Sequence, residues 1–498
     1  MIRRRDILAA PAAALLQTQI RPVKPNILFL MSDQHRGDCM GNAGNAAAIT
    51  PNMDRLAREG ARFTAAYSST PSCTPARACL LTGLSPWNHG MLGYSRVAQQ
   101  YPFEMPRAMA DAGYHTCAIG KLHYTPQRNT HGYHTALLDE SGRSESIDFR
   151  SDYRSWFYSQ APNLNPDETG IGWNDYPAKP YVLPERLHPT TWTADCAVNF
   201  LKTYATHQPF FLKVSFARPH SPYDPPSRWF NRFADRDLPL ASAGKWAGRW
   251  EPKSSQDPSL WHGDLGAKQV RESRQGYYGS VSFVDEQIGR ILEILEKRGL
   301  LDRTLIVYTS DHGDMTGDHN LWRKSYAYEG SAKIPMLIRW PKGLGPENRG
   351  QVRPEPVELR DIFATFLDAA GVEPTKKIDG QSMLRLVNGK SDGWREYIDL
   401  EHDICYGPDN HWSALTDGKV KYIFHARDGQ EQLFNLKADP GELHDLAGEQ
   451  QSEALLRLWR ERMISHLAPR GEQWVASGKL ALRPQSIMLS PNYPSPNR

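Results

Sequence analysis

The sequence carries almost no excess of either charge. Its 498 residues include 59 Lys and Arg and 56 Asp and Glu, which leaves a formal net charge of +3. Proteins dedicated to nucleic-acid binding normally show a concentrated basic face, so this balance argues against nucleic acid as a partner. Apolar residues make up 40% of the chain, which is enough for a large globular core.

Cysteine is scarce and dispersed. No two cysteines form a C-x-x-C pair. That spacing argues against a structural zinc site, and it predicts no particular disulfide pairing. The six cysteines are Cys39, Cys73, Cys79, Cys117, Cys196 and Cys405.

Long apolar runs are missing as well. No segment after the N-terminal region approaches the length of a transmembrane helix, so stable membrane insertion is not expected. The opening "MIRRRDILAAPAAALLQTQI" places three arginines before a short apolar run. This is the pattern of an export signal, and the arginine pair indicates the twin-arginine route. We expect residues 1–22 to be this signal and the protein to be exported, either to the periplasm or out of the cell.

Several short apolar runs are each followed by polar residues, and helical patterns such as 52–60 and 284–300 lie between them. Short runs without polar alternation are typical of buried parallel strands. Strands that alternate with helices predict an α/β fold with a mostly parallel sheet. The predicted strands are 26–31, 116–120, 209–217 and 304–309.

The residues that follow these strands predict one shared site. In open α/β sheets, ligands bind beyond the carboxyl ends of the strands. The carboxylate and amide oxygens among these residues suit a hard cation such as Ca²⁺ or Mg²⁺, and the nitrogen of His312 leaves Mn²⁺ or Zn²⁺ open. The candidate metal ligands are Asp33, Gln34, Asp311 and His312.

Basic and titratable residues surround this predicted metal site. They would repel one another and the metal unless an anion lies among them, which predicts a tetrahedral guest such as a sulfate or phosphate ester. Histidine can serve there as a general acid or base near neutral pH. The candidates are Arg77, Lys121, His123, His220 and Lys324.

The stretch "PSCTPARACLLTG" (71–83) places a thiol close to a positive charge. Pro75 fits the first turn of a helix through residues 76–81. Cys73 then lies at the helix N-terminus, where the dipole favours an anion, with Arg77 one turn further on. These residues predict an anion-transfer site without fixing the nature of its nucleophile.

These motifs resemble the sulfatase family, a branch of the alkaline-phosphatase superfamily. "CTPARACLLTG" is similar to the family's first signature, and "GYHTCAIGKLH" (113–123) to its second, with one residue fewer between the Lys and the His. The segments 24–38, 50–67, "SDHGD" and "LFNLKADPGELHDLA" also fit the family layout. The resemblance covers roughly residues 24–465 and implies an alkaline-phosphatase-like fold, a large mixed, mostly parallel sheet sandwiched by helices.

The resemblance also implies the chemistry. A formylglycine-generating enzyme would oxidise Cys73 to Cα-formylglycine, whose hydrated aldehyde attacks sulfur, and Arg77 would steady this group. The residue at 73 would bind one divalent metal together with the four candidate ligands; we expect Ca²⁺, with Mg²⁺ and Mn²⁺ as alternatives. Asp311 could also activate the attacking hydroxyl. Lys121, His123 and Lys324 would hold the sulfate oxygens, His123 would aid elimination, and His220, alone or with Lys324, would give a proton to the leaving alcohol.

Two positions depart from the commonest family pattern. Gln34 stands where many members have Asp, and His312 where many have Asn. The combination of Gln and His at these two positions resembles the pattern of choline sulfatases, many bacterial sulfatases and phosphonate monoester hydrolases. The last group lacks the Lys and His found here at 121 and 123, so the resemblance favours a sulfate ester.

Beyond the catalytic domain, predicted over 24–385, we expect a smaller C-terminal α+β subdomain over 386–467. It contains the strand-like run 419–425 and the helical pattern 452–467. Residues 468–498 are rich in Pro and Ser, and we expect an irregular tail.

The substrate has to be inferred from two long segments, 124–190 and 222–275, which look like insertions over the site. Their aromatic residues favour a sulfated saccharide. An aryl or choline sulfate, a phosphonate or phosphate ester, and an inactive saccharide-binding protein are the alternatives. The aromatic residues are Tyr133, Tyr153, Trp156, Trp173, Tyr176, Trp229, Trp246, Trp250 and Trp261.

Overall fold

The structure is a computed structural model that describes residues 24–494. The export signal predicted over residues 1–22 lies outside the described residues. Within the described part of the chain, every helix is too short or too polar to cross a bilayer.

An eight-stranded sheet forms the centre of the molecule, in the order β4-β3-β5-β1-β6-β7-β2-β8. Neighbouring strands run parallel except at β7, which is antiparallel to both β6 and β2. The predicted mixed, mostly parallel sheet is therefore confirmed. The strands are β1 (Asn26–Asp33), β2 (Ala61–Tyr67), β3 (His115–Gly120), β4 (Thr135–Leu138), β5 (Phe210–Pro219), β6 (Thr304–Ser310), β7 (Met336–Arg339) and β8 (Gln351–Glu358).

The four strands predicted from the sequence are β1, β3, β5 and β6, and they are adjacent in the sheet. Their residues are buried almost without exception because helices cover both faces. Leu28 of β1 lies opposite Leu212 of β5 and Ile306 of β6. This parallel register brings the carboxyl ends of the four strands to the same edge.

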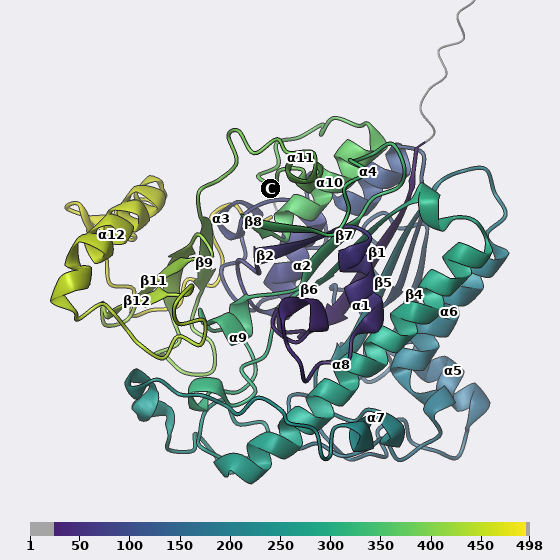
Figure 1. The fold of residues 1–498 in the computed structure, drawn as a ribbon, viewed down its shortest axis with the longest axis horizontal. Helices are drawn as coiled ribbons and strands as arrows, with labels where there is room; N and C mark the ends of the chain where they lie inside the picture. Colours follow the sequence, from purple (N-terminus) through teal and green to yellow (C-terminus); the bar gives the residue numbers. More distant parts are fainter. Residues whose placement is uncertain (1–23, 495–498) are drawn as a thin grey trace, which may run out of the picture.

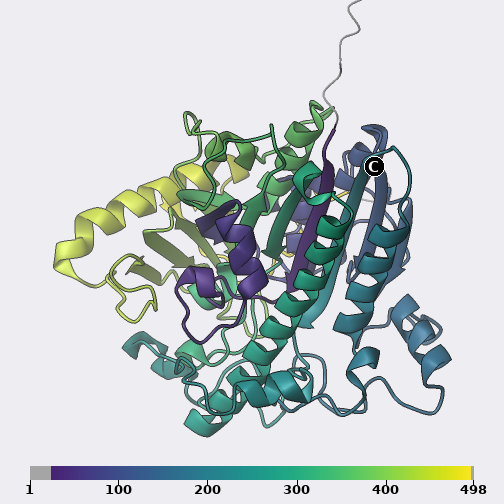
Figure 2. The same cartoon turned by 45° about the vertical axis from the view of Figure 1, so that its right-hand side comes forward.

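Two layers of helices enclose the sheet (Figure 1). On one face, α1 (Pro51–Arg58), α6 (Pro189–Thr203) and the long α8 (Gly266–Lys297) pack over the central strands. The turned view in Figure 2 shows α6 and α8 lying along the strands. The opposite face is covered by α2 (Cys73–Thr82), α4 (Met105–Asp111), α10 (Arg360–Ala370) and α11 (Met383–Val387). Shorter helices in the connections are α3 (Pro86–His89), α5 (Asp152–Gln160), α7 (Ser227–Arg232) and α9 (Glu329–Ala332).

The helix predicted over 284–300 is only the C-terminal half of α8, which begins at Gly266. The N-terminal half contains Gly276 and Gly279, which have low helix propensity and weaken the sequence signal. A Cβ at Gly276 would lie 2.5 Å from the Cβ of Ala178, and one at Gly279 would lie 2.7 Å from Cγ of Pro225. Close packing against the loops therefore explains these two glycines.

The C-terminal subdomain is built on an antiparallel sheet in the order β12-β11-β10-β9, shown at the left of Figure 1. The helix α12 (Glu453–Leu467) packs against this sheet through an apolar cluster that includes Trp459 and Leu433. The predicted strand 419–425 and helix 452–467 correspond to β11 and α12. The strands are β9 (Ile398–His402), β10 (Trp412–Thr416), β11 (Val420–His425) and β12 (Glu431–Asn435).

The segment after residue 468 has little regular structure beyond the short hairpin of β13 (Val475–Ala476) and β14 (Lys479–Leu480). It nevertheless returns to the catalytic domain. Leu92 donates its backbone N–H to the carbonyl of Met488 at 3.0 Å, and Ser490 donates to the carbonyl of Gly90 at 2.8 Å. The tail is therefore irregular in form but docked in place.

Gly90 permits this docking. Its φ is 92°, and a Cβ there would lie 2.3 Å from Cα of Tyr493. Gly44 has the same φ, but no atom lies within 4 Å of the position that its Cβ would take.

We expect Gly44→Ala to lower the free energy of unfolding by roughly 1–2 kcal/mol, because alanine is strained in the left-handed backbone conformation. Gly90→Ala should in addition detach the tail, and amide hydrogen exchange at residues 488–493 should accelerate at least tenfold. Equal exchange rates in the two variants would contradict this packing.

Candidate active site

The edge formed by the carboxyl ends of the four strands holds all ten predicted site residues, and none is more than 6% exposed. Asp33 ends β1, Lys121 follows β3, His220 follows β5 and Asp311 follows β6. The backbone fixes two of these positions, because His220 N–H donates to the Asp33 carbonyl at 3.0 Å and Lys121 N–H donates to the Ser215 carbonyl at 2.8 Å. The expected convergence of the strand ends is thus present in the fold.

Arg77 joins two of these strand ends. Its guanidinium donates to Oδ2 of Asp311 through Nε and Nη2, at 3.2 and 3.1 Å, and to Oδ2 of Asp33 through Nη2 at 3.0 Å. Nη1 donates to the carbonyl of Lys121 at 2.7 Å. Arg77, one turn into α2, therefore connects this helix to the ends of β1, β3 and β6 through one fully buried side chain.

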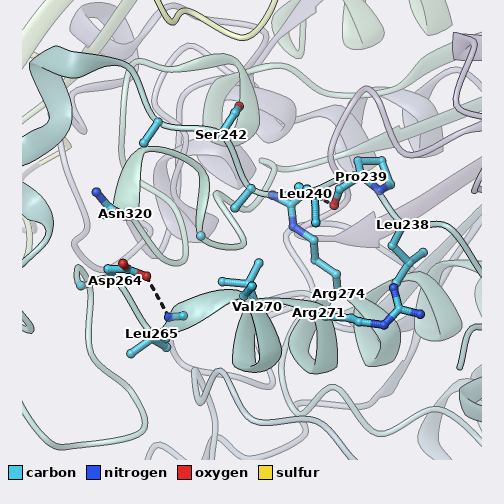
Figure 3. Close-up of a pocket in the computed structure, with 16 residues that line it drawn as sticks. Leu238, Pro239, Leu240, Ser242, Asp264, Leu265, Val270, Arg271, Arg274 and Asn320 are labelled. Carbon is cyan, nitrogen blue, oxygen red and sulfur yellow. Dashed lines mark hydrogen bonds between the residues drawn. The ribbon is translucent and has the colours of Figure 1, made fainter.

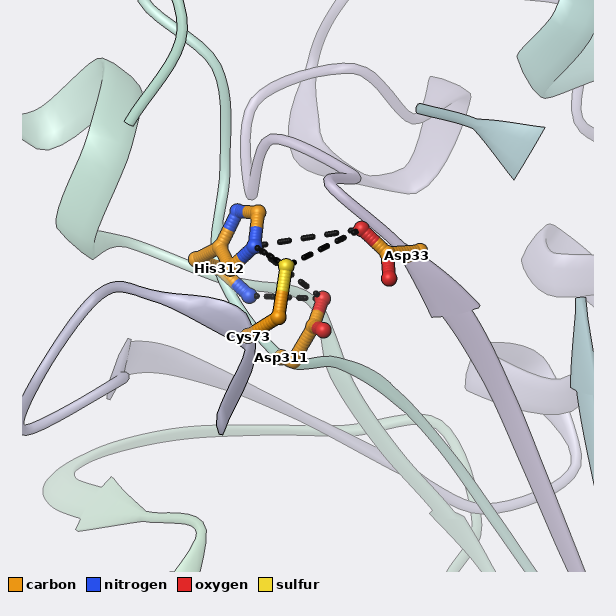
Figure 4. Close-up of side chains that lie close together, drawn as sticks. All are labelled: Asp33, Cys73, Asp311 and His312. Carbon is orange, nitrogen blue, oxygen red and sulfur yellow. Dashed lines mark hydrogen bonds and ion pairs between the residues drawn. The ribbon is translucent and has the colours of Figure 1, made fainter. Parts of the chain in front are cut away.

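The opposite oxygens of the two carboxylates face a compact group of donor atoms (Figure 4). Ligand atoms of Asp33, Cys73, Asp311 and His312 all lie within 4.8 Å of one another. Nε2 of His312 is 3.1 Å from Sγ of Cys73, 3.8 Å from Oδ1 of Asp33 and 3.7 Å from Oδ1 of Asp311. Carboxylate oxygens with an imidazole nitrogen suit a divalent cation.

The ring of His312 is oriented for such a role. Its Nδ1 lies 2.9 Å from the carbonyl of Gly313, so Nδ1–H donates there and Nε2 presents its lone pair to the group. A hydrogen bond of this kind fixes the tautomer of metal-binding histidines. Burial lowers the pKa of His312, but Asp311 and Cys73 outweigh burial and raise it above the ordinary value.

Gln34 lies beside the group with a φ of 68°. Its backbone N–H donates to Oδ1 of Asp311 at 3.1 Å, and its side-chain Oε1 accepts from Nζ of Lys324 at 2.9 Å. Its Nε2 donates to Oδ2 of Asp314 at 2.5 Å. Asp314 is fully buried and also accepts from the hydroxyl of Tyr223. We did not predict a role for Asp314, although it is the second Asp of the "SDHGD" motif.

Lys324 and His220 form a pair. Nζ of Lys324 lies 2.7 Å from Nε2 of His220, and Nδ1 of His220 lies 2.8 Å from the carbonyl of Ser221. Nδ1–H therefore donates to Ser221, and Nε2 accepts from the ammonium group. Burial and the neighbouring Lys324 hold the pKa of His220 well below its ordinary value, so the ring is neutral.

Trp173 covers this pair. Its ring stacks on His220 with centroids 4.0 Å apart and an interplanar angle of 21°, and Nζ of Lys121 lies 4.6 Å from its centroid. The segment 124–190 thus reaches the site as expected. Tyr133 and Tyr153, which we predicted in the same rim segment, are instead buried in hydrophobic cores.

His123 occupies the other side of the site with a φ of 60°. Its Nδ1 accepts from Nη1 of Arg143 at 2.7 Å, and its Nε2 lies 3.3 Å from the hydroxyl of Tyr94. Burial, Arg143 and Lys121 lower the pKa of His123 well below its ordinary value. Glu140 holds this turn, because its Oε1 accepts the backbone N–H of His123 at 2.8 Å. Sequence reasoning missed Tyr94, Glu140 and Arg143, which lie outside the motifs.

Positive charge exceeds negative charge at the centre of the site. Burial raises the pKa of Asp33, but Lys121, His220 and Arg77 outweigh it and hold this pKa well below its ordinary value. Lys121 contacts Oδ2 of Asp33 and lies 4.0 Å from Sγ of Cys73. Three cationic side chains, Arg77, Lys121 and Lys324, surround two carboxylates. A bound cation would further increase this excess of positive charge. The site is therefore suited to an anionic guest.

A cavity of about 1090 Å³ adjoins this group and is lined by His123 and by Thr74, the residue after Cys73. A smaller cavity of about 270 Å³, shown in Figure 3, lies against the start of α8 and contains none of the predicted site residues. Its Arg274 is paired with Asp318 at 2.7 Å. Of these two cavities, the larger is the one lined by a neighbour of Cys73, Thr74.

Comparison with known proteins agrees with this geometry. The family model described as Sulfatase matches residues 25–372, and the one described as N-sulphoglucosamine sulphohydrolase, C-terminal, matches residues 317–468. An arylsulfatase of Clostridium perfringens is 38% identical over 92% of this chain and 97% of its own length. An N-acetylglucosamine-6-O-sulfatase of Bacteroides thetaiotaomicron is 29% identical over 89% of this chain and 87% of its own. The crystal structure of a phosphonate monoester hydrolase of Agrobacterium radiobacter is 27% identical, with a TM-score of 0.75 over 90% of this chain and 96% of that one.

The charge around Cys73 predicts how its unmodified thiol ionises. Burial and Asp33 raise its pKa, but Lys121, Lys324 and His312 outweigh them and lower it to about 7. The thiolate should therefore form above about pH 7 and disappear as the pH falls through this value. In metal-free protein, the difference in thiolate absorbance between wild type and Cys73→Ser should titrate with that midpoint.

Cys79, in the same helix, provides the control. Burial raises its pKa well above the ordinary value, so Cys79→Ser should reveal no step across the same pH range. Lys121→Met should move the Cys73 midpoint upward. A midpoint at the ordinary thiol pKa in the wild type would refute this electrostatic account.

Proposed function

The chain belongs to the sulfatase family, and we propose that it removes sulfate from a sulfated saccharide through a Cα-formylglycine made from Cys73 and a divalent metal ion. The main observation behind this proposal is the cluster of side chains at the ends of the strands. There Cys73, the two carboxylates and His312 lie together, and Arg77 and Lys121 contact the same carboxylates.

The donor set fits a metal ion. Oδ1 of Asp33 and Oδ1 of Asp311 face the group while their Oδ2 atoms are held by Arg77. We propose that these oxygens, Nε2 of His312, Oε1 of Gln34 and the residue at 73 hold the ion. The predominance of oxygen favours Ca²⁺, with Mg²⁺ and Mn²⁺ as alternatives. When bound, the ion supplies charge that stabilises the sulfuryl oxygens.

Formylglycine suits position 73 for a physical reason. A thiolate is a poor nucleophile for a sulfate ester, whereas the hydrated aldehyde supplies one hydroxyl for attack on sulfur and a second for release of sulfate. In this structure the side chain at 73 is at the N-terminus of α2 and lies 4.0 Å from Nζ of Lys121. Oxidation of Cys73 by a formylglycine-generating enzyme is therefore part of the proposal. Export of the protein, directed by residues 1–22, is also part of the proposal.

The basic residues have distinct proposed tasks. Lys121 and Lys324 neutralise the charge of the sulfate oxygens, and the neutral ring of His123 donates a hydrogen bond to them. Hydrogen bonds to charged oxygens are stronger than those to neutral oxygens. His123 accepts from Arg143 through Nδ1, so its Nε2 carries the hydrogen. This Nε2–H can donate to the Tyr94 hydroxyl, 3.3 Å away, or to a bound sulfate oxygen. Asp311 keeps Oδ1 beside the nucleophile position and can accept its proton.

The proton for the leaving alcohol comes from the Lys324–His220 pair. Because Nδ1 of His220 is engaged by Ser221, the mobile proton lies between Nζ and Nε2, which are 2.7 Å apart. Proton donation to the departing oxygen lowers the barrier most when that oxygen is a poor leaving group. A sugar hydroxyl is such a group.

A saccharide substrate is supported by three observations. Trp173 stacks at the site, the adjoining cavity of about 1090 Å³ has room for a sugar, and one relative is an N-acetylglucosamine-6-O-sulfatase. The arylsulfatase relative supports an aryl sulfate as the alternative. The likeness to a phosphonate monoester hydrolase supports a second candidate activity on phosphorus esters, which the ratio of rates on aryl sulfate and aryl phosphonate would measure.

The modification of Cys73 is directly testable. Protein co-produced with a formylglycine-generating enzyme should show, by peptide mass spectrometry across residues 71–83, loss of the sulfur atom and an aldehyde at position 73. Because the nucleophile is lost, Cys73→Ala should lower kcat/KM for an aryl sulfate by ~10⁴-fold or more, while Cys79→Ala should retain activity. An unmodified thiol in fully active protein would exclude formylglycine as the nucleophile.

His220→Ala tests proton donation. We expect kcat for a sugar sulfate to fall by ~10²-fold or more, and kcat for 4-nitrophenyl sulfate, whose leaving group needs no proton, to fall much less. The measurement is the slope of log kcat against the pKa of the leaving alcohol, which should become steeper in the variant. An equal decrease for all leaving groups would assign His220 a positioning role only.

A further inference from the structure

Two arginines, Arg96 and Arg143, line the cavity beside Cys73. Neither forms an ion pair with any carboxylate of residues 24–494. Arg143 donates to the neutral ring of His123 at 2.7 Å, which leaves its charge uncompensated. Glu145 also lines the cavity, and its Oε2 accepts the backbone N–H of Gln127 at 2.8 Å.

Five segments of the chain line this cavity. They are Thr74, residues 94–96, residues within 123–127, residues 142–146 and Tyr493 of the C-terminal tail. The hydroxyl of Tyr493 donates to the carbonyl of Arg96 at 2.8 Å, so the tail fixes the backbone that carries one of the two arginines.

The C-terminal subdomain holds the tail in position. Asp403, which follows β9, accepts the backbone N–H of Ile487 at 3.0 Å and also the hydroxyl of Ser486. Asn492 donates to the carbonyl of Trp87 at 3.1 Å. The wall made by Tyr493 is therefore a fixed part of the cavity.

We propose that this cavity recognises a second anionic group on the substrate, either a carboxylate or a further sulfate, through Arg96 and Arg143. The inference rests on the proposed function, because the first sulfate must lie at Cys73 for the rest of the substrate to enter the cavity. Guanidinium groups bind carboxylate and sulfate through paired N–H donors. The substrate class is thus a sulfate ester whose organic part is itself anionic, such as an acidic or multiply sulfated sugar.

Binding to the Cys73→Ala protein tests this inference without turnover. We would measure Kd by calorimetry, at fixed ionic strength, for two matched pairs of ligands. The first pair is phenyl sulfate and 3-carboxyphenyl sulfate, and the second is N-acetylglucosamine 6-sulfate, whose amide is uncharged, and glucosamine 2-N,6-O-disulfate. We expect the doubly anionic member of at least one pair to bind about tenfold more tightly, a difference of about 1.4 kcal/mol. The pair that shows the preference identifies the anion.

Two further variants separate recognition from general electrostatics. Arg96→Ala should reduce the preference to less than twofold. Arg271→Ala, which removes a positive charge at the separate cavity of Figure 3, should keep it. Equal affinity for both members of both pairs in the Cys73→Ala protein, or an unchanged preference in Arg96→Ala, would overturn the inference. Hydrolysis of singly and doubly anionic esters at equal rates by the wild type would retain the proposed function and still overturn it.

Discussion

The bridge that Arg77 makes between Asp33 and Asp311 is the interaction on which the site depends. Each carboxylate gives Oδ2 to the guanidinium and turns Oδ1 toward Cys73 and His312. One buried residue of α2 thereby aligns the ends of β1 and β6. It also fixes the position of α2, the helix that carries residue 73. Removing one partner from a buried ionic group typically costs about 3–5 kcal/mol, which is a substantial part of a domain's stability.

The excess of positive charge explains several properties together. Lys121 helps hold Asp33 ionised, and Lys121 and Lys324 lower the pKa of Cys73 to about 7. Lys324 also helps keep His220 neutral. Lys324, one of the charges that favour an anion at residue 73, is thus also the partner of the neutral His220 ring, at 2.7 Å. Anion binding and proton donation are consequences of one arrangement.

Much of this arrangement could be predicted because it lies on buried parallel strands. Their short apolar runs indicate where β1, β3, β5 and β6 end, and the sheet brings those ends to one edge. Loop residues left no comparable signal. Arg143 and Trp173 reach the site from the long connection between β4 and α6. Nothing local to Tyr493 indicates that a tail packs against Gly90. Such contacts depend on tertiary packing alone.

The division between strands and loops also separates two kinds of selectivity. In the proposed function, the donors at the strand ends bind a tetrahedral group through its oxygen atoms. Sulfate and phosphonate esters share this feature, which is consistent with the structural likeness to a phosphonate hydrolase. Discrimination between substrates has to come from groups that touch the rest of the molecule. In this chain those groups include Arg96, Arg143 and Tyr493. The C-terminal tail, through its contact with Arg96, therefore belongs to the proposed recognition site as well as to the fold.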